Sequence, residues 1–170
     1  MSSEAVQDTE RAWLLPLRGG VRAAAAEYEL LEVIPQPRLE GDLGDEATLA
    51  WRDRLLPVVD PAAPFHRETE APWAAVARAL DPEGTVVFAA LPLAAPPQAV
   101  TVHDGLACEP PQGTLREHLV WSQFALGAFR DGATAVPILD LGRVFSAPGR
   151  ARLARYAGAA IHRCPAEAPA

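Results

Sequence analysis

Lysine is absent from this sequence, because all 15 basic residues are arginine, and 22 acidic residues outnumber them. The formal charge of −7 and the isoelectric point near 5.1 disfavour electrostatic capture of nucleic acid or of an anionic membrane. Cysteine is scarce as well. Cys108 and Cys164 cannot build a disulfide framework, and neither has a thiol or histidine nearby at zinc-ligand spacing. We therefore expect no nucleic-acid partner, no metal and no cofactor.

Long hydrophobic runs are also missing. The longest uncharged stretch, residues 84–102, approaches the length of a membrane span, but Pro92, Pro96 and Pro97 interrupt it. The first residues lack the basic and then apolar layout of a secretory signal. We therefore expect a cytoplasmic protein that does not insert directly into a membrane.

The apolar residues that are present are sufficient for a folded core. They make up 49% of the 170 residues, although many are alanine and add little bulk. A chain of this length forms one domain or two small subdomains that share a core. Residues 1–11 are polar and have no pattern, so we expect a flexible N-terminal tail before the fold begins.

Short apolar runs separated by glycine and proline dominate the chain, which is typical of small β-barrels rather than of a parallel sheet. Gly19-Gly20 marks a tight turn between the first two runs. Pro57 places its strand at an edge or a bulge, because proline donates no hydrogen bond to a ladder. The predicted strands are 13–17, 21–26, 54–60, 85–91, 99–102 and 134–140.

Helical spacing occurs in three places. Residues 27–34 predict about two turns, ended by the prolines that follow. Apolar residues at 73, 76, 77 and 80 predict a second helix from Pro72, with Thr69 as its cap. A final amphipathic helix begins at Pro148, with Ser146 in the capping position. We expect this helix to pack on its own barrels, with docking to a partner as the alternative, and residues 115–124 fit either helix or strand.

An internal repeat links the two halves of the sequence. Leu55-Leu56-Pro57-Val58-Val59-Asp60 and Ala135-Val136-Pro137-Ile138-Leu139-Asp140 align without a gap, 80 residues apart. An Arg-Asp pair precedes each copy, at Arg52-Asp53 and at Arg130-Asp131. Chance similarity of two apolar strands is the alternative. Duplication is the better hypothesis, and it predicts that the two terminal aspartates occupy matching strand ends.

The order of these pieces resembles the CheW family of chemotaxis coupling proteins. The family's opening strands, glycine turn and E-V helix match residues 13–17, Gly19-Gly20, 21–26 and Leu30-Leu31-Glu32-Val33-Ile34. Its N-L-R-G turn and V-L-P-V-V-D-L strand match Ala50-Trp51-Arg52-Asp53 and residues 55–60, and its L-L-D-L strand matches residues 137–141, followed by Val144-Phe145. The resemblance spans about residues 12–146 and is carried by order and spacing rather than by one motif.

Several positions depart from the family pattern. Asp53 replaces the glycine of the turn, Pro61 follows Asp60 where the family has leucine, and residues 92–112 fit poorly. The chain therefore resembles a divergent member, of the kind attached as accessory coupling proteins to the type IV pilus chemosensory systems of twitching motility.

The resemblance implies an all-β fold with peripheral helices. It consists of two SH3-like five-stranded barrels, at about 12–70 and 85–146, within a single CheW-like domain at 12–146. A C-terminal helix and tail, residues 147–170, would follow this domain.

The resemblance also implies a non-enzymatic adaptor, or scaffold, in signal transduction. Its protein-protein interactions would join the regulatory domain of a CheA-type histidine kinase to the cytoplasmic tip of methyl-accepting chemoreceptors. The family's contact positions fall on Leu30, Glu32 and Arg52. Trp51 completes this partner-binding set, because Trp beside Arg is typical of an interface centre, although a core position is the preferred interpretation for it. An adaptor should then expose an apolar patch at Leu30, Trp51 and Arg52.

Two other functions remain open from the residues. His103-Asp104 could serve a small-ligand enzyme as a base with its orienting carboxylate, although a histidine in a surface loop is the better interpretation. Asp53 in place of the turn glycine would also suit a structural CheW-like protein that has lost kinase coupling. We find no nucleophile elbow, phosphate loop or metal spacing in the sequence, so no catalytic residue is predicted.

Overall fold

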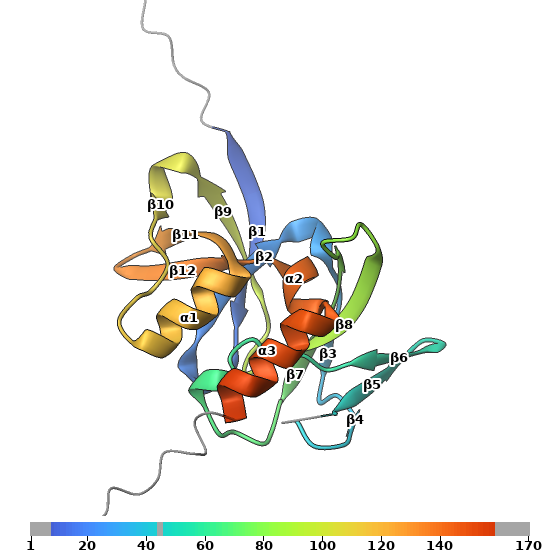
Figure 1. The fold of residues 1–170 in the computed structure, drawn as a ribbon. Coiled ribbons are helices and arrows are strands. Elements are labelled where there is room, and N and C mark those ends of the chain that lie inside the picture. Colours follow the sequence, from blue (N-terminus) through green and yellow to red (C-terminus); the bar gives the residue numbers. More distant parts are fainter. Residues whose placement is uncertain (1–7, 44–45, 159–170) are drawn as a thin grey trace, which may run out of the picture.

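Strands dominate the computed structural model, which describes residues 8–43 and 46–158 (Figure 1). The first part of the chain forms β1 (Thr9–Pro16), β2 (Arg22–Ala26), β3 (Leu30–Pro35), β4 (Leu39–Glu40), β5 (Thr48–Trp51), β6 (Arg54–Pro57), β7 (Trp73–Leu80) and β8 (Val86–Leu93). The rest forms β9 (Gln98–His103), β10 (Ala107–Cys108), α1 (Leu115–Phe124), β11 (Ala125–Asp131), β12 (Thr134–Leu139), α2 (Leu141–Phe145) and α3 (Ala147–Gly158). The 3-10 turns are η1 (Arg18–Gly20), η2 (Glu27–Glu29), η3 (Ala63–Phe65) and η4 (Asp104–Leu106).

The strands form two curled units of equivalent order. In the first unit, β4-β5-β6 continues into β8-β7-β3 through a parallel bridge between Val58 and Ala90. In the second unit, β10-β11-β12 continues into β2-β1-β9 through the parallel pair of Ile138 and Ala24. The predicted all-β class, with two barrel-like subdomains and peripheral helices, is confirmed. Each unit has six strands rather than five, because each includes a two-residue edge strand, β4 or β10.

The predicted duplication is visible in this arrangement. Val58 and Ile138, which form the two parallel contacts, are equivalent positions of the 80-residue repeat. Asp60 and Asp140 both follow these strands and cap the next turn, since Asp60 Oδ1 accepts from the Ala62 N–H and Asp140 Oδ1 from the Arg143 N–H. The prediction of matching strand ends is therefore confirmed.

The hairpin loops before the two repeat copies are also equivalent. Arg52 and Gly132, 80 residues apart, begin their loops with φ of +52° and +61°. The Arg-Asp pairs are not equivalent in space, because Arg52 matches Gly132 rather than Arg130. The Arg-Asp pairs match Arg52 with Arg130, which lies two residues before its structural equivalent, Gly132.

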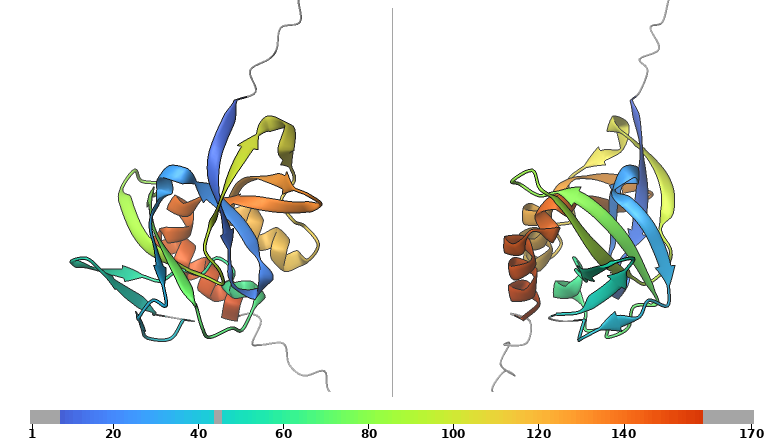
Figure 2. Two further views of the ribbon diagram at one scale, coloured as in Figure 1. Left: turned by 180° about the vertical axis from the view of Figure 1, so that it is seen from behind. Right: turned by 90° about the vertical axis from the view of Figure 1, so that its right-hand side faces the viewer.

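The two units are not consecutive halves of the chain. β1 and β2 lie in the sheet of β9–β12, while residues 30–93 contain every strand of the first unit (Figure 2). The barrel limits at 12–70 and 85–146 are therefore wrong, since β7 and β8 complete the first unit and the N-terminal hairpin completes the second. The tail at 1–11 is also too long, because Thr9 already pairs with His103. Residues 1–7 lie outside the described part.

Two predicted helices are strands. Residues 27–34 form the short turn η2 and then β3, and residues 73–80 form β7. β7 is the central strand of its sheet, and Ala74, Ala75, Val76 and Ala77 are all buried. A strand covered on both faces loses the alternation of apolar and polar residues, so its apolar positions matched a helical stripe by coincidence.

The helices cover one side of the units, as Figure 1 shows. α1 begins at a capping box of Thr114 and Glu117, which settles the ambiguous segment as helix. α3 begins after Ser146, whose Oγ accepts from the Gly149 N–H as predicted. Leu153 of α3 is buried in the main core, so the helix packs on its own barrels. The rest of the predicted C-terminal segment, residues 159–170, lies outside the described residues.

Candidate functional site

Three of the four predicted contact residues meet at the β5–β6 hairpin. Trp51 is the last residue of β5 and pairs with Arg54 across a two-residue loop. Its side chain is only 6% exposed and packs in a small core with Leu49, Leu56 and Val76. Trp51 is therefore a core residue, in agreement with the preferred interpretation of the sequence.

Two guanidinium groups lie on aromatic faces at this hairpin. Arg52 Cζ is 4.3 Å from the centroid of the Trp51 ring, and Arg54 Cζ is 4.5 Å from that of Phe88. Such cation–π contacts contribute about 0.5–1 kcal/mol at exposed sites. They restrict where the positive charges stand, so the hairpin presents two arginines in defined positions on either side of the exposed Asp53.

Glu32 connects β3 to the same hairpin. Its Oε2 accepts a hydrogen bond from Trp51 Nε1, which satisfies the donor of a largely buried indole. Side chains alternate along a strand, and Glu32 shares the inward direction with Ile34, which packs on the small core. Glu32 therefore positions Trp51, and through it the Arg52 guanidinium, in addition to any contact with a partner.

Leu30 does not join this cluster. It is half-buried and packs on the main core between the two units. The exposed apolar side chains near the predicted position are Leu31, Val33 and Leu55, at 37%, 38% and 62% exposure. The expected patch of Leu30, Trp51 and Arg52 is thus wrong in composition. The cause is the secondary structure, because residues 30–35 form the edge strand β3, whose pairing with β7 is irregular between Leu30 and Glu32. Leu30 lies opposite the buried Ala77, whereas Leu31 and Val33 stay more exposed at the sheet edge.

A buried ion cluster joins the two units, and sequence reasoning did not find it. Arg18, from η1 of the N-terminal hairpin, donates from Nη2 to Asp60 Oδ2 at 2.7 Å. Arg18 Nη1 donates to the backbone carbonyls of Glu68 and Glu70 at 2.9 and 3.2 Å. The repeat had singled out Asp60, but nothing in the sequence singles out Arg18, because its partners lie 42 or more residues away.

His66 completes this cluster. Its Nε2 lies 2.7 Å from Asp60 Oδ2, and its Nδ1 accepts from the Glu68 N–H at 3.0 Å. Because the Glu68 N–H donates to Nδ1, the imidazole hydrogen stands on Nε2, which donates to Asp60. A carboxylate shared by a guanidinium and an imidazole is fully satisfied, and this arrangement stabilises the junction rather than offering a reactive group.

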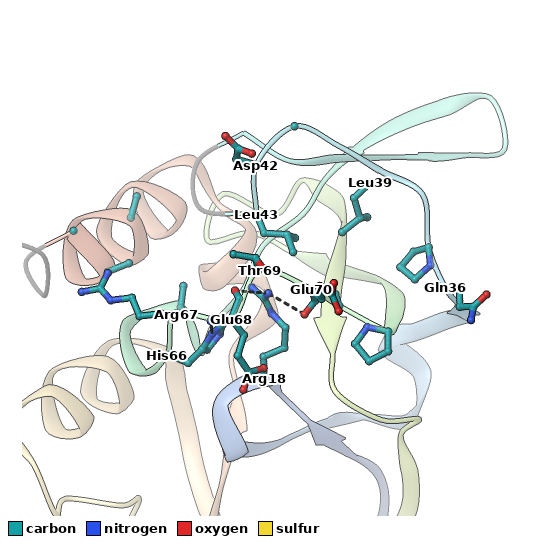
Figure 3. Close-up of a pocket in the computed structure, with 18 residues that line it drawn as sticks. Arg18, Gln36, Leu39, Asp42, Leu43, His66, Arg67, Glu68, Thr69 and Glu70 are labelled. Carbon is teal, nitrogen blue, oxygen red and sulfur yellow. Dashed lines mark hydrogen bonds between the residues drawn. The ribbon is translucent and has the colours of Figure 1, made fainter.

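A groove lies beside this cluster (Figure 3). It has a volume of about 1030 Å³ and is bounded by α3, by the chain before and after β4, and by residues 66–72. We call it the α3 groove.

The enzyme hypothesis gains no support from His103 and Asp104. His103 Nδ1 accepts from the Gly105 N–H at 3.1 Å, which caps the turn η4, and neither residue lines the α3 groove. Within residues 8–43 and 46–158, no group of three or more His, Cys, Asp or Glu is arranged to hold a metal ion. His162 and Cys164 lie outside the described residues. No described helix is long and apolar enough to cross a membrane.

Paired curled β units with a shared core define a class of two-subdomain β fold. The chain is similar in structure to the scaffolding protein TtCheW from Thermoanaerobacter tengcongensis, with a TM-score of 0.60 and 14% sequence identity. The match covers 84% of this chain and 96% of that one. At this identity the likeness shows the fold, which is CheW-like. No protein-family model matches the sequence, and no curated protein matches it either.

Proposed function

We propose that this chain is a non-enzymatic adaptor in chemotaxis-type signal transduction. It would couple methyl-accepting chemoreceptors, through their cytoplasmic tip, to the regulatory domain of a CheA-type histidine kinase in the cytoplasm. An accessory role in a type IV pilus system, and so in twitching motility, belongs to the same proposal, as does a single CheW-like domain within residues 12–146.

The observation that carries the proposal is the hairpin of Trp51 and Arg52. Arg52 is exposed, yet its guanidinium is held over a buried indole that Glu32 orients. Ordering a charged side chain before a partner arrives lowers the entropic cost of binding. A preorganised arginine next to exposed apolar side chains suits recognition of a protein surface, and the CheW-like fold indicates what kind of partner to test.

The test is a calorimetric titration of the chain with the purified kinase regulatory domain and, separately, with the receptor tip. Arg52→Glu is expected to weaken binding about tenfold while the fold persists, because opposite charge against a complementary patch acts on encounter and register. Arg130→Glu is the matched control, since Arg130 is an exposed arginine in β11 of the other unit.

The outcomes separate the alternatives. Equal losses in both variants would attribute the effect to net charge and remove Arg52 from the contact surface. Wild-type binding to the receptor tip but not to the kinase would favour a structural protein without kinase coupling. Binding to neither would refute the proposed adaptor.

A further inference from the structure

The α3 groove continues into a second hollow. This hollow has a volume of about 480 Å³ and lies between α3 and the open ends of β5 and β6. The two hollows share Leu43, Ala63, Ala154 and Ala157 in their walls. Sites for single small ligands span about 300–1,000 Å³, so the combined groove suits a longer occupant such as a peptide segment.

Small and apolar side chains line much of the groove. Ala154 and Ala157 lie about one turn apart on α3, and Pro37, Leu39 and Pro72 line the hollow with them. Short alanine side chains let an incoming backbone approach closely. Proline has no backbone N–H, so this part of the groove offers apolar contact rather than backbone hydrogen bonds.

Five carboxylates and three guanidinium groups line the combined groove, and the second hollow contributes Glu46, Asp60 and Arg150 to them. Glu68, Glu70 and Asp42 are exposed, and among the ion pairs of the described residues none involves these three. Arg18 also lines the hollow, but it is buried and neutralised by Asp60. Figure 3 shows Glu70 in the middle of the groove and Arg67 displaced toward α3. The groove therefore attracts positive charge, as does the chain as a whole at −7.

The buried cluster holds the two glutamates in place. The carbonyls of Glu68 and Glu70 accept from the same Arg18 nitrogen, which fixes the backbone at both residues. His66 and Gln36 tether the same segment, through the Glu68 N–H and the Pro72 carbonyl. The carboxylates are thus presented on an ordered backbone, which lowers the entropic cost of binding.

We propose that the α3 groove binds a basic amphipathic peptide segment of a protein partner. Its apolar side chains would pack on Leu39, Ala154 and Ala157, and its lysine or arginine side chains would pair with Glu68 and Glu70. The groove reaches the open end of the β5–β6 hairpin, whereas Arg52 lies at the tip. A partner bound at the tip therefore leaves the groove free, and this inference does not rest on the proposed function.

The test begins with selection of a displayed library of short random peptides on the intact chain. We expect enriched sequences that combine lysine or arginine with apolar residues. Glu68→Gln with Glu70→Gln should weaken the best peptide about tenfold, because two exposed ion pairs are lost. These changes keep the backbone carbonyls that bind Arg18.

Two further variants complete the design. Glu10→Gln with Glu83→Gln makes the same charge change at exposed positions outside the groove and should leave the affinity unchanged. Ala154→Trp fills the groove and should abolish binding. The proposal is overturned if no peptide is enriched, if enriched peptides lack basic residues, or if the two glutamine pairs weaken binding equally. If Ala154→Trp unfolds the chain, the comparison of the two pairs still decides.

Discussion

Replacing Arg52 by glycine should remove its charge at almost no cost in stability. Arg52 adopts a φ of +52°, a left-handed conformation that costs a residue with a side chain about 1–2 kcal/mol. Glycine adopts this conformation without strain, although it loses about 0.5–1 kcal/mol more backbone entropy on folding. The strain relieved therefore exceeds the entropy lost by about 0–1.5 kcal/mol, with a midpoint of about 0.75 kcal/mol.

The loss of the guanidinium contact lowers the stability of Arg52→Gly and so opposes the gain from relieved strain. Arg52 Cζ stands 4.3 Å from the Trp51 ring centroid, and an exposed cation–π contact contributes about 0.5–1 kcal/mol. Arg52→Gly loses this contact and relieves the strain, so the two terms nearly cancel. Arg52→Ala loses the contact and keeps the strain, so it should destabilise the chain by about 0.5–1 kcal/mol.

Urea denaturation followed by tryptophan fluorescence measures both variants beside the wild type. Both should bind the kinase regulatory domain or receptor tip equally weakly, since both lack the guanidinium. The reasoning is refuted if Arg52→Gly is less stable than Arg52→Ala. It is also refuted if the glycine variant retains full affinity, because the arginine would then be only a turn residue.

Three further predictions concern residues that pack in or beside the first unit. Leu30→Ala should cost less than the roughly 2–5 kcal/mol of a fully buried leucine, because Leu30 is half-buried. Thermal unfolding measures this, and a loss as large as that of a fully buried leucine would contradict it. Burial and the nearby Asp140 carboxylate raise the pKa of Glu29, so its favourable contribution at acid pH is lost as pH rises through the raised value. Glu29→Gln should therefore be more stable than wild type at neutral pH in urea titrations, with a difference that disappears in acid. Gly142→Ala should cost more than about 4 kcal/mol, since its Cβ would lie 1.7 Å from the Leu80 carbonyl oxygen, and an unchanged melting temperature would contradict this packing.

The strands that the sequence predicted well are those with an apolar run and a clear boundary. Gly19 and Gly20, both with positive φ, mark the end of the first run in the sequence and in the structure alike. β7 and β3 were missed for different reasons. β7 is buried on both faces, so its sequence does not alternate between apolar and polar residues. β3 exposes the apolar residues Leu31 and Val33, so its sequence also lacks this alternation and fits a helix with two apolar faces.

The candidate site was predicted only in part, because its geometry depends on contacts between distant residues. The resemblance placed Glu32 and Arg52 in one partner-binding set, and the structure joins them through the Trp51 indole. The partners of Arg18 could not be predicted, since they come from the other unit and include two backbone carbonyls. Every residue has a backbone carbonyl, so the sequence does not reveal which carbonyls bind a buried arginine.

The N-terminal hairpin β1–β2 belongs to the second unit, and this has a consequence for how the chain folds. During synthesis β1 and β2 emerge first, but their sheet neighbours β9 and β12 emerge about a hundred residues later. The first unit, by contrast, has all its strands within residues 30–93 and can assemble while the hairpin still lacks its neighbours. Pairings between distant residues form slowly, so closure of the second unit is expected to limit the folding rate. A circular permutant that begins at β3 and carries β1–β2 after α3 would convert these distant pairings into nearer ones. The same architecture would then be built from two sequentially complete units.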